Sequence, residues 1–79
     1  MKAQVIVKLK ESVLDPQGMA IGRSIAAMGH KGVNLVRQGK IFDIDLTAKT
    51  PSEAEAILKD IGEKLLANTV IEDFEAKLL

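Results

Sequence analysis

The sequence predicts an α+β domain in which two helices cover one face of an antiparallel sheet. Three stretches of the chain alternate apolar and polar residues, as half-buried strands do. Between them stand two helix-start signals, each a capping residue followed directly by proline. With 79 residues, the chain has the length of a single domain, residues 1–79.

The first strand is predicted at residues 2–10. Every second residue from Ala3 to Leu9 is apolar, and the residues between them are polar except Ile6. This alternation is typical of a strand with one buried face.

The first helix is predicted from Pro16 to about Met28. Asp15 is a good N-cap, and Pro16 at the first helical position lacks only an N–H that would have no partner. Gly29 is expected to end the helix in the left-handed conformation. The apolar stripe of this helix consists of Ala20, Ile21, Ile25, Ala27 and Met28.

Two glycines inside this helix, Gly18 and Gly22, lie on the same helical face. Each costs about 0.8–1 kcal/mol relative to alanine, so a packing or functional reason is expected. The favoured interpretation is close packing against the sheet or a sister helix. The alternative is an anion site at the helix N-terminus, although the charge of Asp15 opposes an anion there.

A long central stretch runs from Val33 to Thr47. As one straight strand its fifteen residues would span about 50 Å, whereas a compact domain of this length has a radius of gyration of ~12 Å. The stretch must therefore turn, bend or run past its own domain into a partner. The apolar alternation is clean after Lys40 and ambiguous before Gly39, which predicts either a hairpin or a bent continuous strand at Gly39.

The second helix begins at the capping box Thr50–Glu53, which has proline at the first helical position. Apolar residues at helical spacing continue it to about residue 66, and Asn68 is expected to end it in the left-handed conformation. A final alternating strand is predicted at residues 70–78.

The predicted order is strand, helix, long bent strand or hairpin, helix, strand. This order is typical of a two-layer sandwich related to the ferredoxin-like fold, with two helices on one face of the sheet. The other face carries Ile6 and Ile41 among charged residues. Several apolar side chains on one such face indicate contact with another chain.

The composition excludes several classes of protein. Without cysteine the chain forms no disulfide, zinc ribbon or thiol site. No apolar run approaches the ~20 residues of a membrane span, and the charged N-terminus is unlike a signal peptide, so we expect a cytoplasmic protein without membrane contact. A chain this short buries only about 60% of its unfolded surface, and oligomerisation is the expected source of further stability.

The net charge is zero but unevenly distributed. Residues 1–40 carry seven Lys/Arg and two acids, whereas residues 41–79 carry four and nine. Nucleic-acid binding is not expected, because the basic residues are spread singly and neither Trp nor Tyr is present to stack on bases. The pattern favours two half-domains whose opposite charges face each other or a second subunit.

No cluster of residues suited to catalysis is found. His30 follows the first helix, where histidine ordinarily interacts with the helix dipole. Asp43 and Asp45 point the same way on a strand, but acids on the wet side of a sheet are common. The glycines match no phosphate-binding loop. We therefore expect no catalytic residue, bound cofactor or metal in this chain.

Three segments, read together, resemble a known family. They are residues 14–18 (LDPQG), 37–40 (RQGK) and 65–74 (LLANTVIEDF). In this order, in a small cysteine-free chain, they are similar to PurS, the small subunit of phosphoribosylformylglycinamidine (FGAM) synthase. Thr69 departs from the family, which often has proline there, and this loosens the turn into the last strand.

The resemblance implies a non-catalytic adaptor in de novo purine biosynthesis. The complete enzyme converts FGAR, ATP and glutamine to FGAM, ADP, phosphate and glutamate with Mg²⁺, and the small subunit binds none of these by itself. It joins a glutaminase subunit to a large synthetase subunit and supports ammonia transfer. Self-association is also implied, as a homodimer or a dimer of dimers.

Partner contacts are expected at the start of the first helix, around Gly39, and at an acidic pair in the last strand. Arg37 and Lys40 are suited to carboxylates on a partner, with a solvated turn as the equally weighted alternative. The expected interface residues are Asp15, Pro16, Gln17, Gly18, Arg37, Gly39, Lys40, Glu72 and Asp73.

Two other functions are compatible with the sequence. One is a stand-alone ferredoxin-like regulatory domain that binds a small molecule between subunits. The other is a small enzyme that uses Arg37 or the pair Asp43 and Asp45. A micromolar ligand of the purified chain would favour the first, and turnover without added subunits would favour the second.

Overall fold

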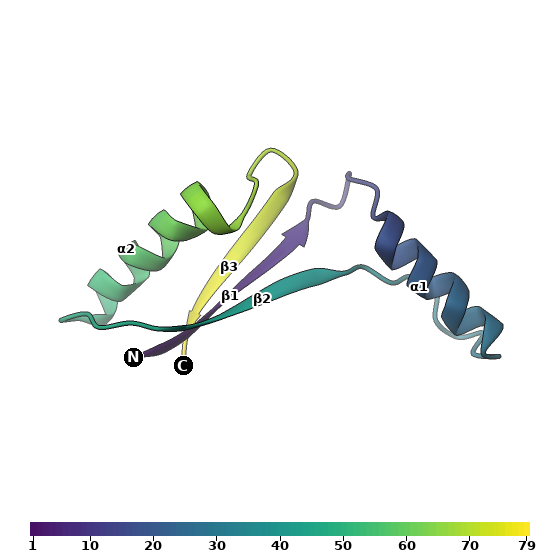
Figure 1. Cartoon of the computed structure of the whole chain (residues 1–79), viewed down its shortest axis with the longest axis horizontal. Coiled ribbons are helices and arrows are strands. Elements are labelled where there is room, and N and C mark those ends of the chain that lie inside the picture. The colour runs from purple at the N-terminus through teal and green to yellow at the C-terminus, as the bar shows by residue number, and fades with distance from the viewer.

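The computed structural model describes all 79 residues as a three-stranded antiparallel sheet with two helices (Figure 1). The strand order is β2-β1-β3. These features confirm the predicted α+β class and the predicted order of elements. The elements are β1 (Lys2–Leu9), α1 (Pro16–Ala27), β2 (Gly39–Asp45), α2 (Pro51–Ile61), a π-helical turn η1 (Gly62–Leu66) and β3 (Glu72–Leu78).

The core lies between α2 and one face of the sheet. Val5 and Val7 of β1 point toward α2, and both are fully buried together with Leu58 of the helix. Burial of this kind stabilises the fold because apolar surface leaves water. The partly buried residues around this core are Phe42, Ile44, Leu46, Ile61, Leu66, Phe74 and Leu78.

The other face of the sheet has no helix over it. Its only apolar cross-strand pair is Ile6 opposite Ile41, and Ile41 remains 61% exposed. Toward the chain termini, Lys2 donates to Asp45 at 3.0 Å, in line with their positions opposite each other. This face is therefore polar with one apolar pair at its centre.

The second helix begins as the capping box predicts. The Thr50 hydroxyl accepts from the Glu53 N–H at 3.1 Å. Its end differs from the prediction, since no residue other than Gly29 has a positive φ, and Asn68 is not left-handed. The π-helical turn η1 instead ends at Leu66, and its C-cap Ala67 is extended. The Asn68 side chain accepts from the Val70 N–H. As a result β3 begins at Glu72, two residues later than predicted.

The first helix does not lie on the sheet. In Figure 1, α1 stands beyond the end of the sheet, at the opposite end of the molecule from α2. We call residues 11–38 the arm and the remaining residues the body. The expectation that both helices cover one sheet face is thus not met within a single chain. None of the helices is both long and apolar enough to cross a membrane.

The reason lies in what α1 packs against. A Cβ on Gly18 would stand 2.3 Å from the Val36 carbonyl oxygen, and one on Gly22 would stand 3.8 Å from a Val36 methyl group. The two glycines therefore allow α1 to approach segment 33–38: the predicted close packing is present, but against this segment and not against the sheet or a sister helix. The apolar stripe that was expected to meet the sheet is left open instead, with Ile21 and Met28 exposed.

The central stretch makes no hairpin at Gly39. The chain runs on from the extended segment 33–38 into β2, and the two together form the long ribbon that joins the arm to the body in Figure 1. The molecule measures 51 × 25 × 14 Å, with a radius of gyration of 15.9 Å. A compact chain of this length would have a radius of gyration of about 12 Å. The stretch therefore neither turns back nor forms one strand: only Gly39–Asp45 is β-strand, and residues 33–38 continue from it past the end of the sheet.

Candidate interaction surfaces

The expected interface residues gather at one end of the sheet, where the arm leaves the body. The start of α1, the segment before β2 and the first residue of β3 meet there around a hollow of about 380 Å³. Residues that are far apart in the sequence are thus neighbours. The hollow is lined by Val7, Leu9, Asp15, Gln17, Gln38, Gly39, Lys40 and Glu72.

Asp15 joins two segments of the chain. One carboxylate oxygen accepts from the Gly18 N–H at 2.9 Å and caps α1, and the other accepts from the Gln38 N–H at 2.7 Å. These N–H groups, that of Gln38 first, hold the pKa of the carboxyl below its ordinary value, and the charge of Arg37 acts in the same direction. Because Asp15 is only 3% exposed, its carboxylate serves the chain itself and leaves no room for an anion at this helix end.

The basic residues near Gly39 are also engaged within the chain. Arg37 donates through Nη2 to the Lys10 carbonyl at 2.9 Å. The Lys40 Nζ lies 3.7 Å from the Glu72 Oε2, and the Glu72 side chain is largely buried. Gly39 itself is required for close approach, because a Cβ there would stand 2.7 Å from the Val7 carbonyl oxygen. Arg37 thus holds the arm to the body, whereas Lys40 pairs within the body, from β2 to β3, and both residues remain exposed.

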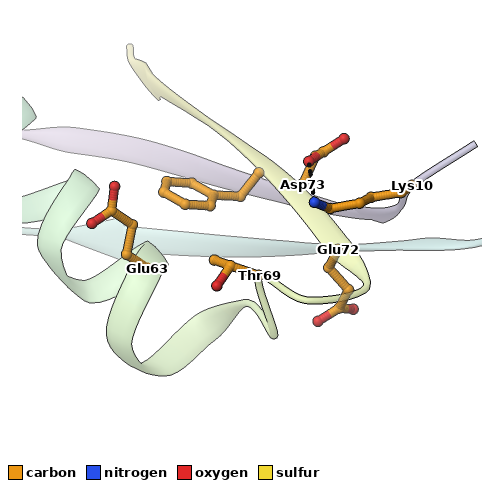
Figure 2. A pocket seen from close by; sticks show the side chains of 6 residues that line it. Lys10, Glu63, Thr69, Glu72 and Asp73 are labelled. Carbon is orange, nitrogen blue, oxygen red and sulfur yellow. Dashed lines mark ion pairs between the residues drawn. The ribbon is translucent and has the colours of Figure 1, made fainter.

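A second hollow, of about 540 Å³, lies beside the first and shares Glu72 with it. Figure 2 shows Asp73 facing Lys10, whose ammonium lies 4.0 Å away, while Glu63 comes from η1 on the other side. The lining contains three acids and one lysine, so the hollow is acidic. The two acids expected at the interface, Glu72 and Asp73, therefore belong to different surroundings, one facing Lys40 and one facing Lys10.

The roles of two residues in this region, Gln38 and Glu63, were not predicted from the sequence. Gln38 acts through its backbone N–H, which no side-chain pattern reveals. Glu63 reaches the second hollow because the π-helical turn places it there, and a regular amphipathic pattern gives no signal for such a turn.

The candidate catalytic residues are used for structure. Asp43 accepts from the Gln4 side-chain amide at 3.0 Å, and Asp45 pairs with Lys2 at the same distance. These cross-strand pairs stabilise the sheet and account for both acids. No group of three or more His, Cys, Asp or Glu residues in the structure is arranged to hold a metal ion.

This arrangement defines a class of protein: a small α+β interaction subunit whose polar side chains are used to hold an extended arm. The chain belongs to the PurS family, since the family model described as "Phosphoribosylformylglycinamidine (FGAM) synthase" matches residues 2–79. The predicted resemblance is thereby confirmed.

Individual relatives agree over nearly the whole chain. The PurS subunit of phosphoribosylformylglycinamidine synthase from Bacillus subtilis is 45% identical over 73 residues, which cover 92% of this chain and 86% of the relative. A crystal form of Bacillus subtilis PurS superposes with a TM-score of 0.85 at 43% identity, covering 96% of this chain and 94% of that chain. A chain in the structure of PurLQS from Thermotoga maritima superposes with a TM-score of 0.91 at 31% identity, covering 99% and 95%.

Proposed function

We propose that this chain is the non-catalytic adaptor subunit of an FGAM synthase, joining a glutaminase subunit to a large synthetase subunit and supporting ammonia transfer between them. Membership in the PurS family supports the enzyme assignment. ATP, Mg²⁺ and glutamine are used by the whole complex and not bound by this chain alone. The cytoplasmic location stays a prediction, supported by the match to subunits of a biosynthetic enzyme.

The observation that carries the adaptor role is the exposed arm. Only nine of 79 residues are buried, and the arm contributes just Asp15 and Gly18 to them. Large apolar side chains of the arm, among them Leu35 at 75% exposure, have no cover within the chain. Exposed apolar surface on this scale is typical of chains that bind other chains.

A second copy of the chain is the proposed first partner. The segment 33–38 is extended, yet the backbone groups of residues 33–37 make no hydrogen bond to other backbone groups, and the outer edge of β2 is also unpaired. An unpaired strand edge is a template for another strand. Two copies related by a twofold axis would each place segment 33–38 along the partner's β2, in an isologous contact.

Such a pairing also covers the arm. The partner's α1 would lie beside α2 on the same sheet face and so complete between two chains the two-helix layer that the sequence predicts. Charge favours this placement, because residues 16–38 carry three basic residues and no acid, whereas residues 51–66 carry four acids and two lysines. Complementary charges of this kind guide association and fix its register. A dimer of dimers would then use a further surface.

The self-association is tested by sedimentation of the purified chain over a range of concentrations. We expect a dimer at micromolar concentration. A chain that stays monomeric throughout would remove the proposed pairing of copies.

The adaptor role is tested by using the chain as bait in cell extract with ADP, Mg²⁺ and glutamine. We expect the glutaminase and synthetase subunits to copurify. The variant Arg37→Glu with Lys40→Glu should reduce their capture, while the control Lys49→Glu with Lys77→Glu, at the opposite end of the sheet, should not. Equal capture by both double variants would exclude Arg37 and Lys40 from the interface.

The competing regulatory-domain hypothesis makes a different prediction. The two hollows at the arm junction are open and lined mostly by polar residues, and a small ligand held there would give a calorimetric signal with the isolated chain. Titration with amino acids and nucleotides therefore separates the two functions. A micromolar ligand in the absence of other subunits would favour the regulatory domain.

A further inference from the structure

The arm is attached to the body almost entirely by polar contacts. No residue of α1 other than Gly18 is buried, and Gly18 packs on the arm's own segment 33–38. Between arm and body there is thus no shared apolar core. The direction in which the arm leaves the sheet depends on its two connections to the body and on a few hydrogen bonds beside them.

Asp15 is central among these bonds because its carboxylate has two separate roles. Through Oδ1 it caps α1 at the Gly18 N–H, and through Oδ2 it holds the Gln38 N–H, the last backbone donor before β2. The bond to Gln38 fixes the start of α1 to the start of the strand. Charged acceptors form hydrogen bonds about twice as strong as neutral ones, so this joint is stiffer than a neutral side chain would make it.

A second hydrogen bond between the arm and the body lies nearby. The Arg37 guanidinium donates to the carbonyl of Lys10. Lys10 is the last residue of the body before the other connection to the arm. Both connections are thereby held at their base, one by Asp15 and one by Arg37. Lys40 and Glu72 also line the hollow around Asp15, and they pair with each other.

We infer that Asp15 is a positioning residue for assembly: its bond to the Gln38 N–H sets the direction of the arm and so presents the extended segment for pairing with a second copy. The inference rests on the proposed function for its consequence but not for its geometry. Asp15 acts from within the chain, because its buried carboxylate is bonded to backbone N–H groups of the same chain. This role is separate from the predicted contact of Asp15 with a partner.

The two roles of Asp15 are separable by substitution. In Asp15→Asn the side-chain oxygen still accepts from Gly18, because asparagine is as good an N-cap as aspartate. Its NH₂ group, however, then faces the Gln38 N–H, and two donors cannot bond each other. Asp15→Ser likewise keeps a cap but is too short for both bonds. Thr50→Ala is the matched control, since it removes the N-cap of α2 and leaves the arm junction intact.

Amide hydrogen exchange by NMR tests the joint without reference to any partner. In Asp15→Asn and Asp15→Ser we expect the Gln38 amide to exchange at least about ten-fold faster, the loss expected for a hydrogen bond to a charged group. The amides of Val5 and Val7 in the body should exchange as before. Unchanged exchange at Gln38 in both variants would overturn the inference.

Sedimentation then tests the consequence for assembly. Both Asp15 variants should dimerise about ten- to hundred-fold more weakly. At protein concentrations low enough for the chains to be monomeric, the urea midpoint of the body's unfolding should be unchanged. Thr50→Ala should show the reverse, a lower midpoint with unchanged dimerisation. If the Asp15 variants dimerise as tightly as the original chain, Asp15 does not position the arm for assembly. If the original chain is itself monomeric, the proposed pairing fails. The exchange experiment then still tests whether the Asp15 carboxylate holds the Gln38 N–H.

Discussion

The body and the arm differ in how much apolar surface each buries within the chain. The body buries Val5, Val7 and Leu58 between α2 and the sheet, and its stability comes from that core. The arm buries one glycine and one carboxylate and leaves its apolar side chains in water. The body is thus complete within one chain, whereas the arm has its shape set locally and its apolar surface left for a neighbour. Substitutions should therefore affect unfolding in the body and assembly in the arm.

The largest effect on stability is expected from Leu58→Ala. Leu58 is fully buried in the core, and truncation of such a leucine leaves a cavity and costs about 2–5 kcal/mol. Urea denaturation followed by circular dichroism measures the loss. A change below 1 kcal/mol would show that the core of the body is not the main source of stability.

A smaller effect is expected from Gly62→Ala. A Cβ at this position would stand 2.5 Å from the Phe74 ring, which packs on the core. Overpacking of this kind costs about 1–3 kcal/mol, which exceeds the ~1 kcal/mol that alanine gains in a helix. Gly32→Ala, with no atom within 4 Å of the added Cβ, is the control and should be close to neutral in the same denaturation experiment. Equal stability of the two variants would contradict the close contact at Phe74.

Leu35→Ser should show most clearly that the arm affects dimerisation and the body affects unfolding. Leu35 lies in the extended part of the arm at 75% exposure, so its loss should change the free energy of unfolding of an isolated chain by less than about 0.5 kcal/mol. Dimerisation should weaken by about ten-fold or more, because the side chain is expected to be buried in the pair. Sedimentation at several concentrations measures the change. Unaltered dimerisation would mean that segment 33–38 is not the contact.

The smallest effect is expected from lowering the pH. The folded-state pKa of Asp15 is lowered, so its contribution to the joint is fully present above the unfolded value of 3.8 and is lost as the pH falls through the lower folded pKa. Exchange at the Gln38 amide, followed by NMR against pH and corrected for the intrinsic rate, should accelerate in that range. Arg37, Lys40 and Glu72 are the charged groups nearest the carboxyl. The Asp15→Asn variant should lack the transition; if it retains the transition, the titrating group is another one.

The sequence was sufficient to predict the elements but not the position of α1. Capping residues act locally, so Asp15 and Thr50 marked both helix starts correctly. The apolar stripe of α1 predicted that one helix face is buried, but not by which chain. Amphipathic spacing is the same whether the helix packs on its own chain or on a second one. The overlong central stretch was the informative signal, since its length alone required a turn or an exit from the domain.

Within the candidate interface, the structure brings several of the predicted residues together and gives them roles inside the chain that the sequence did not indicate. Asp15, Lys40 and Glu72 do meet at one hollow, but Asp15 and Glu72 are largely turned inward. The partner of Asp15 is a backbone N–H twenty-three positions away, at Gln38, and no pattern of side chains encodes such a bond. Whether the nine expected residues contact the partner subunits stays a prediction.

The unbroken passage from segment 33–38 into β2 has a consequence for protein engineering. If two copies exchange arms across this passage, then a reversal such as Asn-Gly inserted before Gly39 would let each arm fold back on its own sheet, since this dipeptide favours tight hairpins. The product would be a self-contained monomer with both helices over one sheet, and a single insertion would have converted a dimer into two independent molecules.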